Sequence, residues 1–307
     1  MFPIIPANSV TAASGNDEGI FGFGHIPGIT AITNLVSNAG VVATDTAGAA
    51  GVVGKYTHAA CEFGGDKAIF GFGHTGSITA ATNLVSNTGV IASDTAGVGT
   101  ARYTIAACSY GEDKGIFGFG YATPSLLSVT NLVSNAGVVA SDQAAVTGTA
   151  RYGLTGCEFG SDQAIFGYGL GASYYSITNL VSNAGVVATD TAGVGTARSQ
   201  LGGCSYGGDK GIFGFGYFGD PAHTAVTNLV SNTGVVSSDQ AAVTGTARRR
   251  GAACEFGGDQ AIFGFGINGS DVNVSITNLV SNTGVVASDQ AAETGTGRQG
   301  LAACSFN

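Results

Sequence analysis

The chain has 307 residues, of which 10% are charged and 44% hydrophobic, and it contains 52 glycines. Its 20 acidic and 11 basic residues give a net charge of −9, and residues 248–250, all arginine, form the only run of three like charges. This balance argues against a nucleic-acid partner, which requires a basic surface. The low charge content favours an uncharged partner or a packed assembly.

The chain begins with MFPIIPANS, which has no basic segment before its short apolar stretch. No later stretch approaches the roughly 18 consecutive apolar residues of a membrane-spanning helix. The sequence therefore predicts a soluble protein with no signal peptide and no membrane insertion.

Six near-copies of one segment fill most of the chain. The isoleucine of a glycine-rich aromatic strand, such as AIFGFG at 68–73, recurs as Ile20, Ile69, Ile116, Ile165, Ile212 and Ile262. The first asparagine of a TNLVSN segment recurs as Asn34, Asn83, Asn131, Asn179, Asn228 and Asn278. The aspartate of a following GVVASD-like segment recurs as Asp45, Asp94, Asp142, Asp190, Asp239 and Asp289. A repeat of about 48 residues indicates one structural unit per copy, each packed on its neighbours.

Within one copy the pattern predicts four β-strands. AACEFG and KAIFGFG alternate small or aromatic residues with period two, and NLVS and VVAS are rich in β-forming residues. The connections GGD or GED, and NAG or NTG, supply the Gly and Asn that accept positive φ in tight turns. We therefore expect an all-β fold, a six-bladed β-propeller of four-stranded antiparallel blades. A β-solenoid is the alternative, although it needs end caps that the sequence does not contain.

The two ends of the chain indicate how the ring closes. AACSF at 302–306 is a seventh copy of the first strand, whereas VTAAS at 10–14 has Ala12 where the other copies have cysteine. We expect 302–306 to complete the blade of Ile20 and close the ring. Residues 1–9 would then form a docking arm, and 10–307 the propeller. In the alternative, the N-terminal strand closes the ring and the C-terminus is frayed.

Neighbouring copies alternate in a regular way. The residue after the repeated cysteine is in turn Glu62, Ser109, Glu158, Ser205, Glu255 and Ser305. The repeated unit is therefore a pair of copies, which predicts approximate threefold symmetry. This symmetry reflects either ancestry or the symmetry of a partner.

The repeated cysteines and bases are expected to be structural. Each cysteine stands alone in its copy at an apolar strand position, with no CxxC and no histidine at a ligand spacing, which predicts a buried thiol. Neither a metal site nor a cofactor is predicted, but a cation near Glu62, Glu158 and Glu255 stays open if these carboxylates converge near the ring axis. One base per copy is expected to tie a neighbouring loop to an aspartate. These bases are Lys55, Arg102, Arg151, Arg198, Arg248 and Arg298.

No catalytic pattern is present in the sequence. The four histidines follow no repeat and have no serine or cysteine at a diagnostic spacing, so no catalytic triad can be assembled. GFGHTGS lacks the following helix and the GK[ST] ending of a phosphate-binding loop. The sequence therefore predicts a protein that is not an enzyme.

The segments between the aromatic strand and TN differ most among the copies. They vary in length and chemistry while the flanking strands hardly change, and all should lie on one face of the ring. Flat aromatic side chains with polar neighbours suit a sugar or protein surface, so we predict a ligand-binding face, with unconstrained drift as the alternative. The predicted binding residues are His25, His74, Tyr121, Tyr174, Tyr175, Tyr217, Phe218, Asp220, His223, Asn268, Asp271 and Asn273.

The copies resemble kelch repeats. RYTIAACSYGEDKGIFGFG, followed by VTNLVSN and GVVASD, is similar to the kelch order of an arginine, a small-residue strand, a strand ending in glycines and a strand near an asparagine. The usual glycine doublet is Gly71, Phe72 and Gly73 here, and tryptophan is absent from the chain. The resemblance, over about residues 10–307, is to a divergent kelch branch, whose propellers mostly bind proteins or glycans. Near-identical copies of low charge are also similar to repeat proteins of tailed bacteriophages.

These features together predict a non-enzymatic structural or recognition module on a virion, as a fibre, tail or capsid-surface component assembled in the host cytoplasm. Its expected partners are other virion structural proteins and a host surface glycan or protein, and a homo-oligomer or threefold assembly would fit the alternation of copies. The alternatives are a secreted or cell-surface carbohydrate-binding propeller outside any virus, and a hydrolase or lyase that uses the loop carboxylates.

Overall fold

The computed structural model describes residues 17–143, 148–219, 222–240, 245–290 and 295–306. Throughout these residues the regular structure is β, the strands pair antiparallel, and no helix occurs. The predicted all-β class is therefore confirmed. No helix in this part of the chain is long and apolar enough to cross a membrane. The docking arm expected at 1–9, the strand expected at 10–14 and Asp220 lie outside the described residues.

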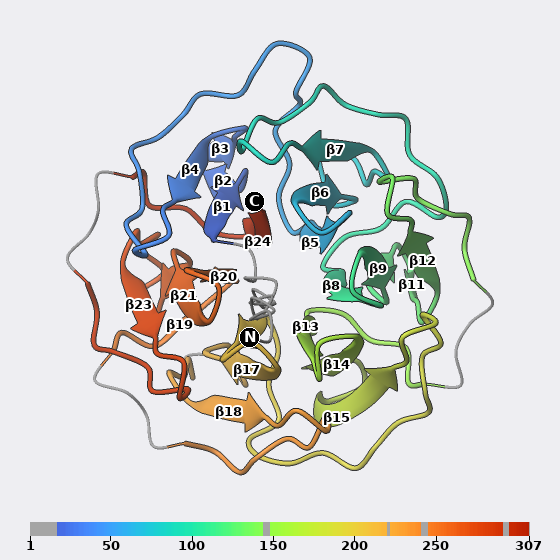
Figure 1. The fold of residues 1–307 in the computed structure, drawn as a ribbon, viewed down its shortest axis with the longest axis vertical. Coiled ribbons are helices and arrows are strands. Elements are labelled where there is room, and N and C mark those ends of the chain that lie inside the picture. Colours follow the sequence, from blue (N-terminus) through green and yellow to red (C-terminus); the bar gives the residue numbers. More distant parts are fainter. Residues whose placement is uncertain (1–16, 144–147, 220–221, 241–244, 291–294, 307) are drawn as a thin grey trace, which may run out of the picture.

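Six separate three-stranded sheets stand around a common axis, each with an inner, a middle and an outer strand (Figure 1). The first sheet consists of β24 (Ala302–Phe306), β1 (Glu18–Gly22) and β4 (Thr33–Val36), and the second of β5 (Ala59–Phe63), β6 (Lys67–Gly71) and β7 (Thr82–Val85). The third and fourth are β8 (Ala106–Tyr110), β9 (Lys114–Gly118) and β12 (Thr130–Val133), then β13 (Thr155–Phe159), β14 (Gln163–Leu170) and β15 (Tyr174–Val181). The fifth and sixth are β16 (Gly202–Tyr206), β17 (Lys210–Gly214) and β18 (Thr227–Val230), then β20 (Ala252–Phe256), β21 (Gln260–Gly264) and β23 (Thr277–Val280).

The C-terminal strand lies in the same sheet as the first described strand. β24 pairs antiparallel with β1, and Cys304 stands opposite Ile20. Residues 302–306 therefore complete the sheet of Ile20, which is the pairing that the sequence predicted. The inner strands contact one another in the order β5, β8, β13, β16, β20 and β24, and β24 contacts β5 in turn.

Six backbone hydrogen bonds close a cycle around the axis, just before the inner strands begin. In each bond the N–H of one copy donates to the carbonyl of the equivalent residue in the preceding copy, with N···O distances of 2.6 to 2.9 Å. All six residues have positive φ. We call this set the inner cycle, and it consists of Thr57, Thr104, Gly153, Gln200, Arg250 and Gly300.

The predicted fourth strand of each copy is not formed, and the sheets have three strands rather than four. In the first copy the outer segment makes only the isolated bridges Val36↔Val42 and Thr33↔Thr46, whose registers differ by one residue. The cause is the buried Asn34, whose Nδ2 donates to the carbonyl of Ala43 and to Asp45 Oδ1, both at 2.9 Å. Between the two bridges the side chain thus replaces part of the backbone ladder, in the manner of a β-bulge.

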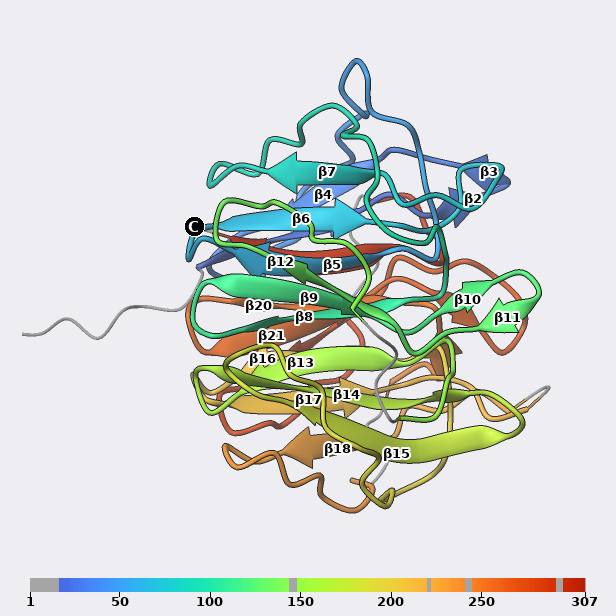
Figure 2. The ribbon, with the colours of Figure 1, turned by 90° about the vertical axis from the view of Figure 1, so that its right-hand side faces the viewer.

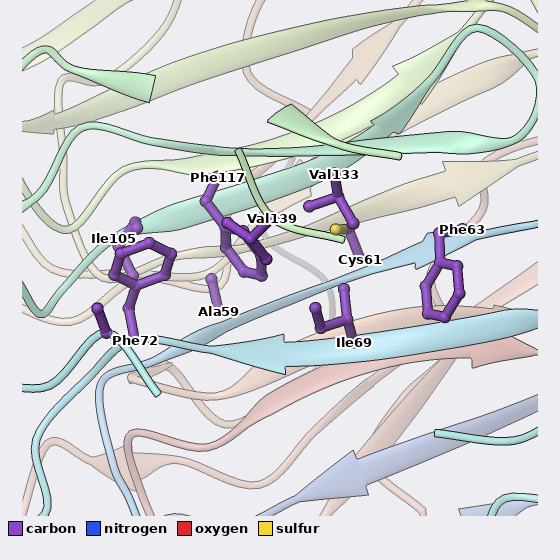
Figure 3. Close-up of a cluster of buried hydrophobic side chains, with 10 residues drawn as sticks. Ala59, Cys61, Phe63, Ile69, Phe72, Ile105, Phe117, Val133 and Val139 are labelled. Carbon is purple, nitrogen blue, oxygen red and sulfur yellow. The ribbon is translucent and has the colours of Figure 1, made fainter. Parts of the chain in front are cut away.

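The hydrophobic core is divided into clusters that lie between adjacent sheets. In the cluster of Figure 3, Cys61, Ile69 and Phe72 of the second sheet pack against Phe117 and Val133 of the third. All six cysteines are buried and unpaired, as predicted. The residue before the repeated Ile-Phe pair alternates between glycine and alanine, as in Gly115 and Ala68. The glycine has a packing cause, because a Cβ on Gly115 would lie 2.5 Å from Cys61 Sγ.

The repeated base lies between sheets and is fully buried. The Arg102 guanidinium stacks 4.4 Å from the ring centroid of Phe72, and Phe72 adopts a left-handed φ of 63°. Nε donates to the Phe119 carbonyl and Nη2 to Asn131 Oδ1, both at 2.7 Å. Asp142 is farther away, at 3.9 Å, and is held instead by Asn131. The base therefore joins two sheets, chiefly through the asparagine rather than the aspartate.

Candidate functional site

The two ends of the ring differ in what they present. The turns between inner and middle strands lie at one end, which we call the turn face, and the variable segments lie at the other, which we call the loop face (Figure 2). Two short hairpins project from the loop face, β2 (His25–Ile26) with β3 (Gly28–Ile29) and β10 (Tyr121–Ala122) with β11 (Ser125–Leu126). β19 (Arg248–Arg249) pairs there with β22 (Ile267–Asn268).

Around the inner cycle, each copy adds two further positions to the loop face. The middle position directly precedes the inner-cycle residue and is occupied by Tyr56, Tyr103, Tyr152, Ser199, Arg249 and Gln299. The outer position is the start of the variable segment and is occupied by His74, Tyr121, Leu170, Tyr217, Ile267 and His25. Backbone pairing joins the middle and outer residues of every copy, so the backbone fixes where these side chains start.

Six of these side chains form a continuous row of rings, which we call the aromatic arc. In order they are His25, Tyr56, His74, Tyr103, Tyr121 and Tyr152. Successive ring centroids are 5.4, 5.2, 6.0, 5.6 and 5.9 Å apart. All six residues are half-buried, so each is packed on one side and accessible on another. The arc covers the first four sheets.

A second aromatic group lies over the fourth and fifth sheets. The ring of Tyr217 is 6.0 Å from that of Tyr174 and 5.4 Å from that of His223. Arg249 places its guanidinium 4.4 Å from the ring centroid of Tyr217 and forms an ion pair of 3.4 Å with Asp271. This group combines aromatic faces with charges of both signs.

The structure thus distributes the predicted binding residues over several environments. His25, His74 and Tyr121 belong to the arc, and Tyr174, Tyr217, His223 and Asp271 belong to the second group. Phe218, which is 41% exposed, and Tyr175 lie outside the ring contacts of both.

Two predicted asparagines form hydrogen bonds within the protein. Asn268 Oδ1 accepts hydrogen bonds from the N–H groups of Ser270 and Val272, both at 3.0 Å, and so holds its own turn. Asn273 Nδ2 donates to the His25 carbonyl at 3.3 Å, which joins the sixth sheet to the first.

Sequence reasoning missed half of the arc. Tyr56, Tyr103 and Tyr152 directly follow the repeated base and are not among the predicted binding residues. The signal was present, because the base hardly changes while the next residue is Tyr, Ser, Arg or Gln. When a variable position follows a nearly constant one, it should be examined as a candidate binding residue in the same way as a variable loop.

At the turn face, the cavity at the mouth of the central channel has a volume of about 570 Å³ and is lined by Glu62, Glu158 and Glu255. Burial, followed by the charge of Glu62, raises the pKa of Glu158 to about 8. The same two causes raise the pKa of Glu255 well above its usual range. Within the described residues, no group of three His, Cys, Asp or Glu side chains is placed to hold a metal ion.

No protein-family model and no curated protein matches the chain.

Proposed function

We propose that the chain is a six-bladed, kelch-like β-propeller that acts as a non-enzymatic recognition module and binds carbohydrate through its loop face. The observation that carries this proposal is the aromatic arc. Rings with an apolar face and a polar edge suit sugars, which present C–H groups on one side and hydroxyls around the rim. The tyrosine hydroxyls and imidazole nitrogens supply the polar contacts of the arc.

Three features support the propeller assignment. The six sheets surround one axis as separate units, the inner cycle links all of them, and the C-terminal strand completes the sheet of β1. The position of Arg102 between two sheets agrees with the kelch order of arginine, small-residue strand and glycine-ended strand. The bulged outer edge and the left-handed Phe72 would be the divergent features of this branch.

The arc is suited to binding because backbone hydrogen bonds hold the residues that carry its side chains in place. The middle residues lie next to the inner cycle and also pair with the outer residues, so little ordering should be needed when a ligand binds. Ring contacts that continue over four sheets provide an extended platform. An extended oligosaccharide fits such a platform better than a single sugar does.

The resemblance to repeat proteins of tailed bacteriophages supports a virion as the setting. The partners would then be other virion structural proteins at one face and a host surface glycan at the loop face. In this setting, we expect purified virus particles to contain the protein in a fixed copy number. If the protein is absent from virus particles, the secreted or cell-surface alternative is favoured and the proposed ligand stays the same.

The test is an oligosaccharide array probed with the purified protein and three variants. Tyr103→Ala removes a central ring of the arc and should weaken binding about tenfold, which corresponds to roughly 1.4 kcal/mol. Tyr103→Phe keeps the ring and should retain most of the affinity. Val138→Ala, which shortens an exposed apolar side chain outside the variable segments and the arc, is the control. Absence of sugar binding, or equal losses for Tyr103→Ala and Val138→Ala, would overturn the proposal.

A further inference from the structure

The three consecutive arginines at 248–250 have three different environments. Arg248 is the buried base between sheets, with Nη2 donating to Asn278 Oδ1 at 2.7 Å. Arg249 is the middle residue of the sixth copy and stacks on Tyr217. Arg250 is the inner-cycle residue of that copy, next to the axis. Only the first of the three is explained by the repeated framework.

Arg250 occupies a position where a large charged side chain is otherwise absent. The other inner-cycle residues are threonine, glycine or glutamine, and Arg250 has a left-handed φ of 55° there. Thr57, Thr104 and Gln200 have the same left-handed φ, so Arg250 is distinguished by the length and charge of its side chain.

The guanidinium of Arg250 is held in place by neutral groups from both neighbouring copies. Nε donates to Gln200 Oε1 at 3.1 Å, and Nη1 donates to Gln299 Oε1 at 3.0 Å. Among the described residues no carboxylate forms an ion pair with it. Burial, followed by the charge of Arg249, lowers the pKa of Arg250. A partly buried cation is usually compensated by an anion, and here that anion is not supplied by its neighbours.

Arg250 lies next to residues of the aromatic arc. The arc covers the first four sheets and begins and ends at His25 and Tyr152. Gln299, which binds Arg250, pairs with His25, and Arg250 interacts electrostatically with Tyr152 and Tyr56. Arg250 therefore lies close to Tyr56 and Tyr152 of the arc and is joined to His25 through Gln299. The inner cycle, the middle positions and the arc contain no acidic residue.

We propose that Arg250 is an anion subsite at the centre of the loop face, and that the bound oligosaccharide is acidic. The carboxylate or sulfate group of the oligosaccharide contacts Arg250, while neutral parts of its sugar rings stack on the arc. This inference rests on the proposed carbohydrate binding and specifies its chemical class. An arginine fork is suited to either anion, because it donates two parallel hydrogen bonds to paired oxygens.

The test compares binding of the full chain to neutral, uronate-containing and sulfated oligosaccharides of similar length. Arg250→Thr introduces the residue that two other copies already have at this position, so the inner cycle should be preserved. Lys114→Gln, which removes one positive charge from the turn face, is the matched control. Titration calorimetry at two salt concentrations gives the affinities, and thermal unfolding checks that both variants are folded.

We expect binding of at least one acidic class, a loss of about tenfold to a hundredfold in Arg250→Thr, and no comparable loss in Lys114→Gln. The uronate and sulfate arms show which anion the subsite accepts. Acidic ligands that bind Arg250→Thr unchanged, or binding of neutral oligosaccharides alone, would overturn the anion subsite but leave carbohydrate binding standing. Binding to none of the three classes would overturn both proposals.

Discussion

Replacing Glu158 by glutamine should stabilise the protein at alkaline pH. In the channel mouth the pKa of Glu158 is about 8, against an ordinary value of 4.5, because the carboxyl group is buried and faces the charge of Glu62. Each pKa unit corresponds to about 1.4 kcal/mol, so ionising Glu158 in the folded chain opposes folding by on the order of 5 kcal/mol. Water in the channel will reduce the measured value.

The sign of the pH dependence follows from the raised pKa. As pH rises, the unfolded chain loses this proton near 4.5, whereas the folded chain keeps it until about 8. Between these values the folded state binds more protons than the unfolded state, so its stability falls as the pH rises. Above about 8 both states have lost the proton and the contribution is constant. Glu158→Gln has no proton to lose at this position, so its stability should fall less with pH than that of the wild-type chain, while Glu255, whose pKa is also raised, still contributes.

Chemical denaturation of the wild-type chain and Glu158→Gln at pH 5 and pH 9 measures the effect. We expect similar unfolding free energies at pH 5 and a variant that is more stable by several kcal/mol at pH 9. Glu18→Gln removes one negative charge from the start of β1, outside the channel, and controls for net charge. A Glu158→Gln variant that is less stable at pH 9, or one that matches Glu18→Gln, would refute the reasoning. If Glu158→Gln is less stable than the wild-type chain and a chelator removes this difference, the glutamates bind a cation.

Three further predictions concern the framework. Arg102→Met should cost about 1–3 kcal/mol for each buried acceptor that it leaves without a donor, the Phe119 carbonyl and Asn131 Oδ1. Arg102→Lys should cost less, since Lys55 donates to the equivalent asparagine at 2.6 Å in the second sheet, and denaturation midpoints measure the difference. Phe306→Ala should cost about 3–5 kcal/mol, and deleting 299–307 should abolish the cooperative thermal transition, because Phe306 is fully buried in the strand that completes the first sheet. A mild thiol reagent should label none of the six cysteines in the folded chain and all six in denaturant, because burial raises the pKa of each thiol.

The repeat made most of the fold predictable. Alternation at period two gave the inner and middle strands, and the surplus cysteine strand at 302–306 indicated how the first sheet is completed. The outer segment was predicted as a fourth strand because VVAS has strand-forming residues. Whether it extends the ladder depends on Asn34, whose side chain bonds Ala43 and Asp45 across the sheet. This competition between side chain and backbone has no signature in local propensity.

The candidate site was predictable only in part, for a similar reason. His25, His74, Tyr121 and Tyr217 could be found because their segments vary in length. Tyr103 was missed because a tyrosine after an arginine also reads as the start of a strand, although the variation of this position among the copies was a usable signal. The place of Arg250 depends on the closure of the inner cycle, which brings together residues of different copies.

The differences among copies are not spread evenly over the loop face, and this bears on what the face recognises. A ring of near-identical units offers the same contacts six times, so it can distinguish an asymmetric ligand only through positions where the copies differ. Here the aromatic residues gather over four adjacent sheets as one connected row, and both arginines of the loop face lie on the sixth. Unconstrained drift would not be expected to place six rings in contact as one row. An elongated ligand with a charged end matches this arrangement better than a threefold or sixfold symmetric partner.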